Sequence, residues 1–156
     1  MSKYRFFILW LSILGIVAVQ SCKKKKDDKD QVKISSAGSA QSHNTGQNCM
    51  NCHKSGEDDT GTFTVAGSVY DSSNTAVYSN AIIKLFTQPH GAGQLRATIN
   101  GDVIGNFYTT SSIDFSGGVY PAVTGSSGIT KYMSASITSG ACNGCHGSST
   151  SKIWIK

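Results

Sequence analysis

The chain has 156 residues, among them 17 glycines and 2 prolines, and charged residues make up 15%. This composition excludes collagen-like, coiled-coil and strongly disordered chains, and the length predicts one domain of short strands joined by turns. The net charge is +5, but from Gln31 onward the chain has only 7 basic and 6 acidic residues. Because binding to many phosphates needs a clustered basic face, nucleic acid is excluded as a partner.

Residues 1–21 have the pattern of a bacterial export signal, with two basic residues ahead of an apolar run over 6–19. That run is shorter than the about 20 residues that span a bilayer. It leads to Ser21-Cys22, which resembles a lipoprotein box, although Gln20 departs from the small residue usual there. The resemblance implies that Cys22 is lipidated and anchors the mature protein to a membrane. A plain cleaved signal and an uncleaved anchor are the alternatives.

Residues 22–42 form a polar segment that begins with lysines and aspartates and continues with Ser, Ala, Gly and Gln. No apolar face can be drawn through it, which predicts a flexible tether. A lysine- and aspartate-rich segment after the lipidated cysteine resembles the surface-export signal of Bacteroidota lipoproteins. This implies an outer-membrane lipoprotein at the cell surface. The alternative is a solvated leash beside anionic headgroups, on the periplasmic face of that membrane.

The other four of the 5 cysteines lie in two Cys-x-x-Cys-His motifs. The motifs consist of Cys49, Cys52 and His53, and of Cys142, Cys145 and His146. This spacing is that of a c-type haem attachment site. Two thiols one short turn apart reach the two vinyl groups of one porphyrin edge, and the following histidine binds the iron as the proximal ligand. The sequence therefore predicts two covalently bound haem c groups, one in segment 43–61 and one in segment 138–156.

Three other uses of the cysteines are open. Four cysteines could bind one zinc ion, but His53 and His146 would then have no role. Two short disulfide loops could form in an oxidising compartment. Two redox-active thiol pairs would require a thioredoxin-like βαβ context, which the sequence lacks.

The distal face of each iron has three candidate ligands. His43 precedes the first motif, Met133 precedes the second, and His90 lies in a Pro-Gly turn. Met50 is excluded because it lies inside its own attachment loop. Two histidines on one iron give a low reduction potential, and a methionine raises it. Haems packed against each other would favour a crossed arrangement, in which His43 reaches the second ring. A five-coordinate iron is the alternative.

Between the motifs, segment 62–137 has the pattern of β-structure. Apolar residues alternate with polar ones, and turn residues recur at the spacing expected of a sandwich. The predicted strands cover 63–69, 81–85, 95–99, 106–110, 119–124 and 131–137, within a total of about seven. Asn100-Gly101 is a hairpin signal at the end of one of them.

Four short motifs in this segment resemble the carboxypeptidase regulatory-like family. They are Gly67-x-Val69-x-Asp71, Ala76-Val77, Asn80-Ala81-x-Ile83-x-Leu85 and Gly105-Asn106-Phe107-Tyr108. The resemblance implies a mostly β fold, a single seven-stranded transthyretin-like β-sandwich flanked by two short haem-binding segments. It implies structural positions and no catalytic residue.

The chain as a whole resembles a dihaem c-type cytochrome lipoprotein of Bacteroidota. We therefore expect an electron carrier that cycles Fe(III)/Fe(II) at the outer membrane with redox partner proteins, and not an enzyme. A binding or structural surface lipoprotein and a haem peroxidase are the alternatives. The haems lie close together only if both motifs leave the sandwich at one end.

Two further groups of residues are weaker candidates. The acidic cluster at 57–59 could bind a cation or a basic partner, although a solvated linker is the simpler interpretation. Tyr120, Tyr132 and Trp154 are the aromatic residues nearest the second motif in sequence and are expected to pack at the haem edge.

Overall fold

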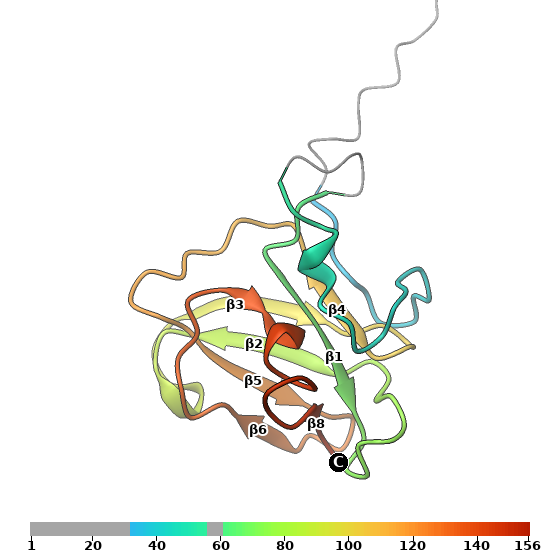
Figure 1. The fold of residues 1–156 in the computed structure, drawn as a ribbon. Coiled ribbons are helices and arrows are strands. Elements are labelled where there is room, and N and C mark those ends of the chain that lie inside the picture. The colour runs from blue at the N-terminus through green and yellow to red at the C-terminus, as the bar shows by residue number, and fades with distance from the viewer. Residues whose placement is uncertain (1–31, 56–60) are drawn as a thin grey trace, which may run out of the picture.

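The computed structural model describes residues 32–55 and 61–156, which form two four-stranded sheets packed as a sandwich (Figure 1). The strands are β1 (Val65–Tyr70), β2 (Ile82–Phe86), β3 (Leu95–Asn100), β4 (Asn106–Thr109), β5 (Tyr120–Thr124), β6 (Thr130–Tyr132), β7 (Gly140–Ala141) and β8 (Ile153–Trp154). Three short 3-10 turns complete the described part: η2 (Cys49–Asn51), η3 (Pro89–Gly91) and η4 (Cys142–Gly144). The prediction of a mostly β fold is confirmed. None of the helical turns in these ranges could span a membrane.

Strand β1 is the centre of the first sheet and is buried along its whole length. It pairs antiparallel with β4, and parallel with both β7 and β8. β7 pairs with Val65 and Ala66, and β8 pairs with Val69 and Tyr70. η4, which connects β7 to β8 in the chain, therefore lies beside the middle of β1. The last segment of the chain, expected to flank the sandwich, therefore supplies two strands that alternation did not predict.

The second sheet has the order β3-β2-β5-β6. Alternate residues of β2 face the core, where Ile83 and Leu85 are buried while Ile82 is exposed. The core between the sheets consists of Val65, Val69, Ala81, Ile83, Leu85, Ile99, Phe107, Val119, Val123 and Ile155. Apolar burial of this kind is the main stabilising contribution to the fold.

The prediction of a hairpin at Asn100-Gly101 is wrong. β3 ends at Asn100 and pairs with β2, whereas the next strand, β4, pairs with β1 in the other sheet. The chain changes sheets over 101–105, where the buried carboxylate of Asp102 accepts hydrogen bonds from the backbone N–H groups of Ile104 and Asn106 at 3.1 and 2.9 Å. These bonds pair two backbone N–H groups of the connection that carries the chain from one sheet to the other.

The described part of the predicted tether is not free. The backbone of residue 33 exchanges hydrogen bonds with Thr110, and Ser35 N–H donates to Tyr108 O at 3.0 Å. The Ser35 side chain is buried and donates to Asn100 O at 2.6 Å. The folded part thus starts near residue 33 and not near residue 43. Backbone groups and one hydroxyl attach this segment to the sandwich, and such polar contacts leave no apolar pattern in the sequence. Residues 22–31 lie outside the described residues, as do Cys22, the signal and the acidic cluster at 57–59.

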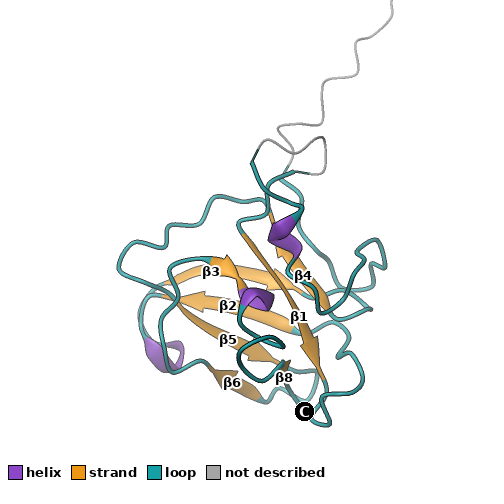
Figure 2. Ribbon diagram, viewed as in Figure 1, coloured by secondary structure: helices purple, strands orange, loops and turns teal. Residues whose placement is uncertain are grey.

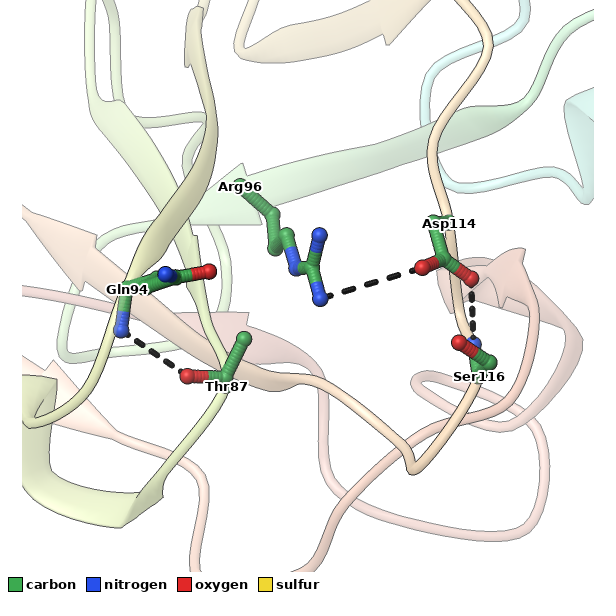
Figure 3. Close-up of polar contacts among 5 residues, drawn as sticks. All are labelled: Thr87, Gln94, Arg96, Asp114 and Ser116. Carbon is green, nitrogen blue, oxygen red and sulfur yellow. Dashed lines mark hydrogen bonds and ion pairs between the residues drawn. The ribbon is translucent and has the colours of Figure 1, made fainter.

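The long connection from β4 to β5 passes beside β3 and is attached to it by an ion pair (Figure 3). Arg96 Nη2 lies 3.7 Å from Asp114 Oδ2, and Asp114 Oδ1 accepts a hydrogen bond from Ser116 N–H at 2.8 Å. Hydrogen bonding from the side chain and the backbone of Ser116 lowers the pKa of Asp114, and the positive charge of Arg96 lowers it further by a smaller amount. On either side of Asp114, Ile113 and Phe115 pack against the core, so the loop covers one end of the sandwich.

Candidate haem sites

Both Cys-x-x-Cys-His motifs fold into the same local structure. In the first, the N–H of His53 donates to Cys49 O at 2.9 Å, and in the second the N–H of His146 donates to Cys142 O at 2.9 Å. The second cysteine of each motif also donates its N–H to the first, Cys52 to Cys49 O and Cys145 to Cys142 O, both at 3.2 Å. Each motif is thus one 3-10 turn, η2 or η4, that begins at the first cysteine and is followed directly by the second cysteine and the histidine. This is the arrangement that two thioether bonds and one iron ligand on a single porphyrin require.

The two turns lie side by side against β1 (Figure 2). Asn143, inside the second motif, donates a hydrogen bond to Gln47 O at 3.0 Å, just before the first motif. Its side chain is buried and also accepts from Ser68 N–H of β1 at 3.1 Å. Segments far apart in the sequence are therefore joined at one place beside β1.

Gly67 of β1 makes the close approach of η4 possible. A Cβ atom at this position would lie 2.9 Å from Cys142 Cβ and 2.5 Å from Phe107 Cζ. Any larger residue would push the second motif or the core aromatic ring away from the strand. Gly67 belongs to the family-like pattern of the sequence, and here it has a direct effect on the position of a cysteine.

The second motif borders a mainly apolar cavity of about 620 Å³. This volume is in the range of cofactor pockets. Cys142, Cys145 and His146 form one side, and the inner face of β2 and β5 forms another. Met133, Tyr132 and Trp154 also line it, as do Leu85, Phe107 and Ile137.

The ring of His146 is oriented for metal binding. Its Nδ1 lies 2.7 Å from Ser151 O. A carbonyl only accepts, so Nδ1 carries the proton and Nε2 has a free lone pair. Histidines that bind metals usually donate their other N–H to a carbonyl or carboxylate in this way. The residues of this cavity therefore fit a haem. Ser151 was not predicted, because nothing in the sequence marks a backbone acceptor.

The first motif borders a smaller cavity of about 240 Å³, lined by His43, Cys49, Cys52, His53, Phe63 and Tyr108, among others. The ring of His53 stacks on Phe63 with centroids 3.9 Å apart, and Phe63 stacks on Tyr108 at 4.7 Å. The ring centre of His53 also lies 5.9 Å from the ring centre of His43. The planes of the two imidazoles are tilted by 42°, and the pair could together hold one metal ion.

The buried Nδ1 of His53 has no hydrogen-bond partner in the described part of the chain. It differs in this from Nδ1 of His146, which has the Ser151 carbonyl as its partner. The fit of the first motif to an iron porphyrin therefore rests on the two histidines at one cavity and not on the hydrogen bonding of the His53 ring.

His43 is held in place by a polar network that the sequence did not predict. Ser42 donates to the buried carboxylate of Asp102. Asn106 Nδ2 donates to Ser42 Oγ at 3.0 Å and to His43 O at 3.3 Å. Only the Gly105-Asn106 part of the family-like pattern could have drawn attention to this asparagine.

The remaining predicted residues fall into two groups. Tyr132 and Trp154 line the second cavity, whereas Tyr120 does not. His90 is exposed in η3 and lines neither cavity, although its ring centre lies 6.0 Å from that of Tyr132. His43 lies beside the proximal histidine of its own motif, so the structure gives no support to the crossed arrangement.

The state of the thiols bears on the competing uses of the cysteines. All four described cysteines are free, and the described residues contain no group of three or more His, Cys, Asp or Glu suited to a metal ion. Burial raises the pKa of Cys49, and it raises the pKa of Cys142 to about 12. Redox-active thiol pairs have lowered pKa values instead. The described residues thus show neither a grouped set of zinc ligands nor an activated thiol pair.

No family model, no curated protein and no solved structure matches the chain.

Proposed function

We propose that this protein is a membrane-anchored dihaem c-type cytochrome that carries electrons. The observation that carries the proposal is the position of the two Cys-x-x-Cys-His turns, side by side on β1 and each at its own cavity. Such an arrangement would hold two haems near each other, as rapid transfer between them requires.

Each motif has its own set of residues for one haem. Cys49 and Cys52 would form the thioether bonds at the first site, and Cys142 and Cys145 at the second. When bound, each haem would supply an iron that cycles between Fe(III) and Fe(II). The chain's own contribution is to fix the proximal histidines, to exclude water with the apolar walls of the cavities, and to hold the two sites together through Asn143.

An electron carrier is better supported than a peroxidase. Peroxide chemistry needs an open distal site with an acid or base side chain above it. The described residues that line the larger cavity include no carboxylate and no histidine besides His146, and Met133 is among them as a candidate iron ligand; Lys131 and Tyr132 are the other lining groups able to exchange a proton.

The location and the finer fold belong to the same proposal. The lipidated Cys22 and the polar segment after it would attach the protein to the outer membrane, on its cell-surface or periplasmic face, near its redox partner proteins. The sandwich would be of the transthyretin-like type, which two four-stranded sheets support.

The test is the absorption spectrum and intact mass of the full-length protein, produced with export and haem attachment. We expect a Soret band and a mass gain of two haems. The variants Cys52→Ser and Cys145→Ser are each expected to show impaired attachment at one site only. A protein without a Soret band and without added mass would refute the cytochrome and leave a binding or structural surface lipoprotein.

A further inference from the structure

The two sites differ in the residues opposite their proximal histidines. At the first motif, His43 and His53 have ring centres 5.9 Å apart and line one cavity. The backbone carbonyl of His43 is fixed by Asn106, whose side chain is itself buried. The first site thus has two imidazoles, one on an exposed loop residue whose backbone carbonyl is bonded to Asn106 of β4 and one in the Cys-x-x-Cys-His motif.

At the second motif, the residue in the corresponding role is a methionine. Met133 and His146 line the same cavity. The backbone N–H of Met133 donates to Pro121 O at 2.9 Å, which attaches the methionine to the end of β5. Met133 is half-buried, and part of its surface lines the cavity.

No second histidine is available at this cavity. The chain has 4 histidines. Two of them are at the first site, His146 is the proximal residue of the second, and His90 lines neither cavity.

From this asymmetry we infer that the two haems have different axial ligands and different potentials: His53 and His43 at the first iron, and His146 and Met133 at the second. The inference rests on the proposed function. Two imidazoles favour Fe(III) and lower the reduction potential, whereas a thioether ligand favours Fe(II) and raises it. At equilibrium, a single electron would therefore reside mainly on the second haem and leave the first oxidised.

The experiment is a spectroelectrochemical titration of the full-length haem-loaded protein. We expect two separate one-electron steps. The species that is reduced at the higher potential is expected to show, when oxidised, the far-red charge-transfer band of an iron–thioether bond. Two coincident steps without that band would overturn the inference while leaving the dihaem cytochrome intact. A protein without haem would refute the proposed function itself, and the inference with it.

Three variants assign the ligands, and two more serve as controls. Met133→Leu is expected to abolish the charge-transfer band, and Met133→His to lower the upper step toward the lower one. His43→Met is expected to raise the lower step and to leave the upper step in place. His90→Ala and Met50→Leu serve as matched controls and are expected to change neither step. An unaltered band in Met133→Leu, or an unaltered lower step in His43→Met, would contradict the assignment of that ligand.

Discussion

The side-chain amide of Asn143 donates a hydrogen bond to the backbone carbonyl of Gln47, 96 residues earlier in the chain. The same amide also bonds to the backbone N–H and the hydroxyl of Ser68 in β1. A buried side chain with three such bonds joins the two attachment turns through the central strand. The spacing of the two sites therefore depends on one residue that lies between two cysteines.

Replacing this residue tests that relationship. Asn143→Ala leaves the buried Ser68 N–H without its partner, at a cost of about 1–3 kcal/mol, and also removes the bond to Gln47 O, which still accepts from Cys49 Sγ at 3.6 Å. We expect the free energy of unfolding to fall by about 2–4 kcal/mol, measured by urea denaturation. Asn51→Ala is the matched control, because Asn51 is an exposed asparagine in the other motif, and it should cost under about 0.5 kcal/mol. Equal losses in the two variants would show that Asn143 does not join the sites.

The close packing at Gly67 gives a second prediction. Gly67→Ala introduces a Cβ atom into the space between Phe107 and Cys142. Overpacking of this kind costs about 1–3 kcal/mol. Thermal unfolding should show a lowered Tm, and the double variant Gly67→Ala/Phe107→Leu should recover part of it. Gly144→Ala is the control, since its Cβ would lie at an ordinary 3.4 Å from Asn48 Nδ2. A Tm unchanged in Gly67→Ala would contradict the packing described.

The thiols give a prediction for the haem-free protein. Cys145 is exposed, whereas burial raises the pKa of Cys142 to about 12. A raised pKa keeps the thiol neutral at pH 8, so its thiolate fraction is about a thousandfold smaller than that of a free cysteine. Timed alkylation followed by peptide mass mapping should label Cys145 first. Labelling of Cys142 should accelerate up to about pH 12. Fast labelling of Cys142 at pH 8 would indicate an activated thiol instead.

A lysine at the second cavity gives a prediction for the loaded protein. The ammonium group of Lys131 lies over the ring of Trp154, and both residues line the cavity. A cation there favours the Fe(II) state and can pair with a haem propionate. Lys131→Gln should therefore lower the potential of the second haem in a redox titration.

Lys84→Gln is the control for that experiment. Lys84 lies on β2 between Ile83 and Leu85, which both line the cavity, so its own side chain leaves from the opposite face of the sheet. The control should leave both potentials in place. A shift of the same size in both variants would show that the effect of Lys131 comes from the net charge and not from its position.

Alternation in the sequence predicted most of the sandwich. The strands from β1 to β5 lie within or close to the predicted runs, because each has one face in the core. The run over 131–137 was too long: β6 ends at Tyr132, and Ile137 makes only an isolated bridge with Val119. β7 and β8 have two residues each, too few for any period to show.

The spacing of the cysteines pointed to two attachment turns, but their adjacency could not be predicted. It depends on parallel pairing of the chain end with β1 and on the buried contacts of Asn143, neither of which has a local pattern. For the same reason the position of His43 was open. Its neighbour Ser42 is held by Asp102, a carboxylate that sequence alone would assign to an exposed turn.

The parallel pairing of β8 with β1 has a consequence for the larger cavity. Ile155, three residues after Lys152, is fully buried in the core, and its N–H donates to Tyr70 O at 3.0 Å. β8 therefore covers an edge of β1 and fills the core from a segment remote in the sequence. Because Ile153 and Trp154 of the same strand line the larger cavity, detachment of β8 would open one wall of that cavity.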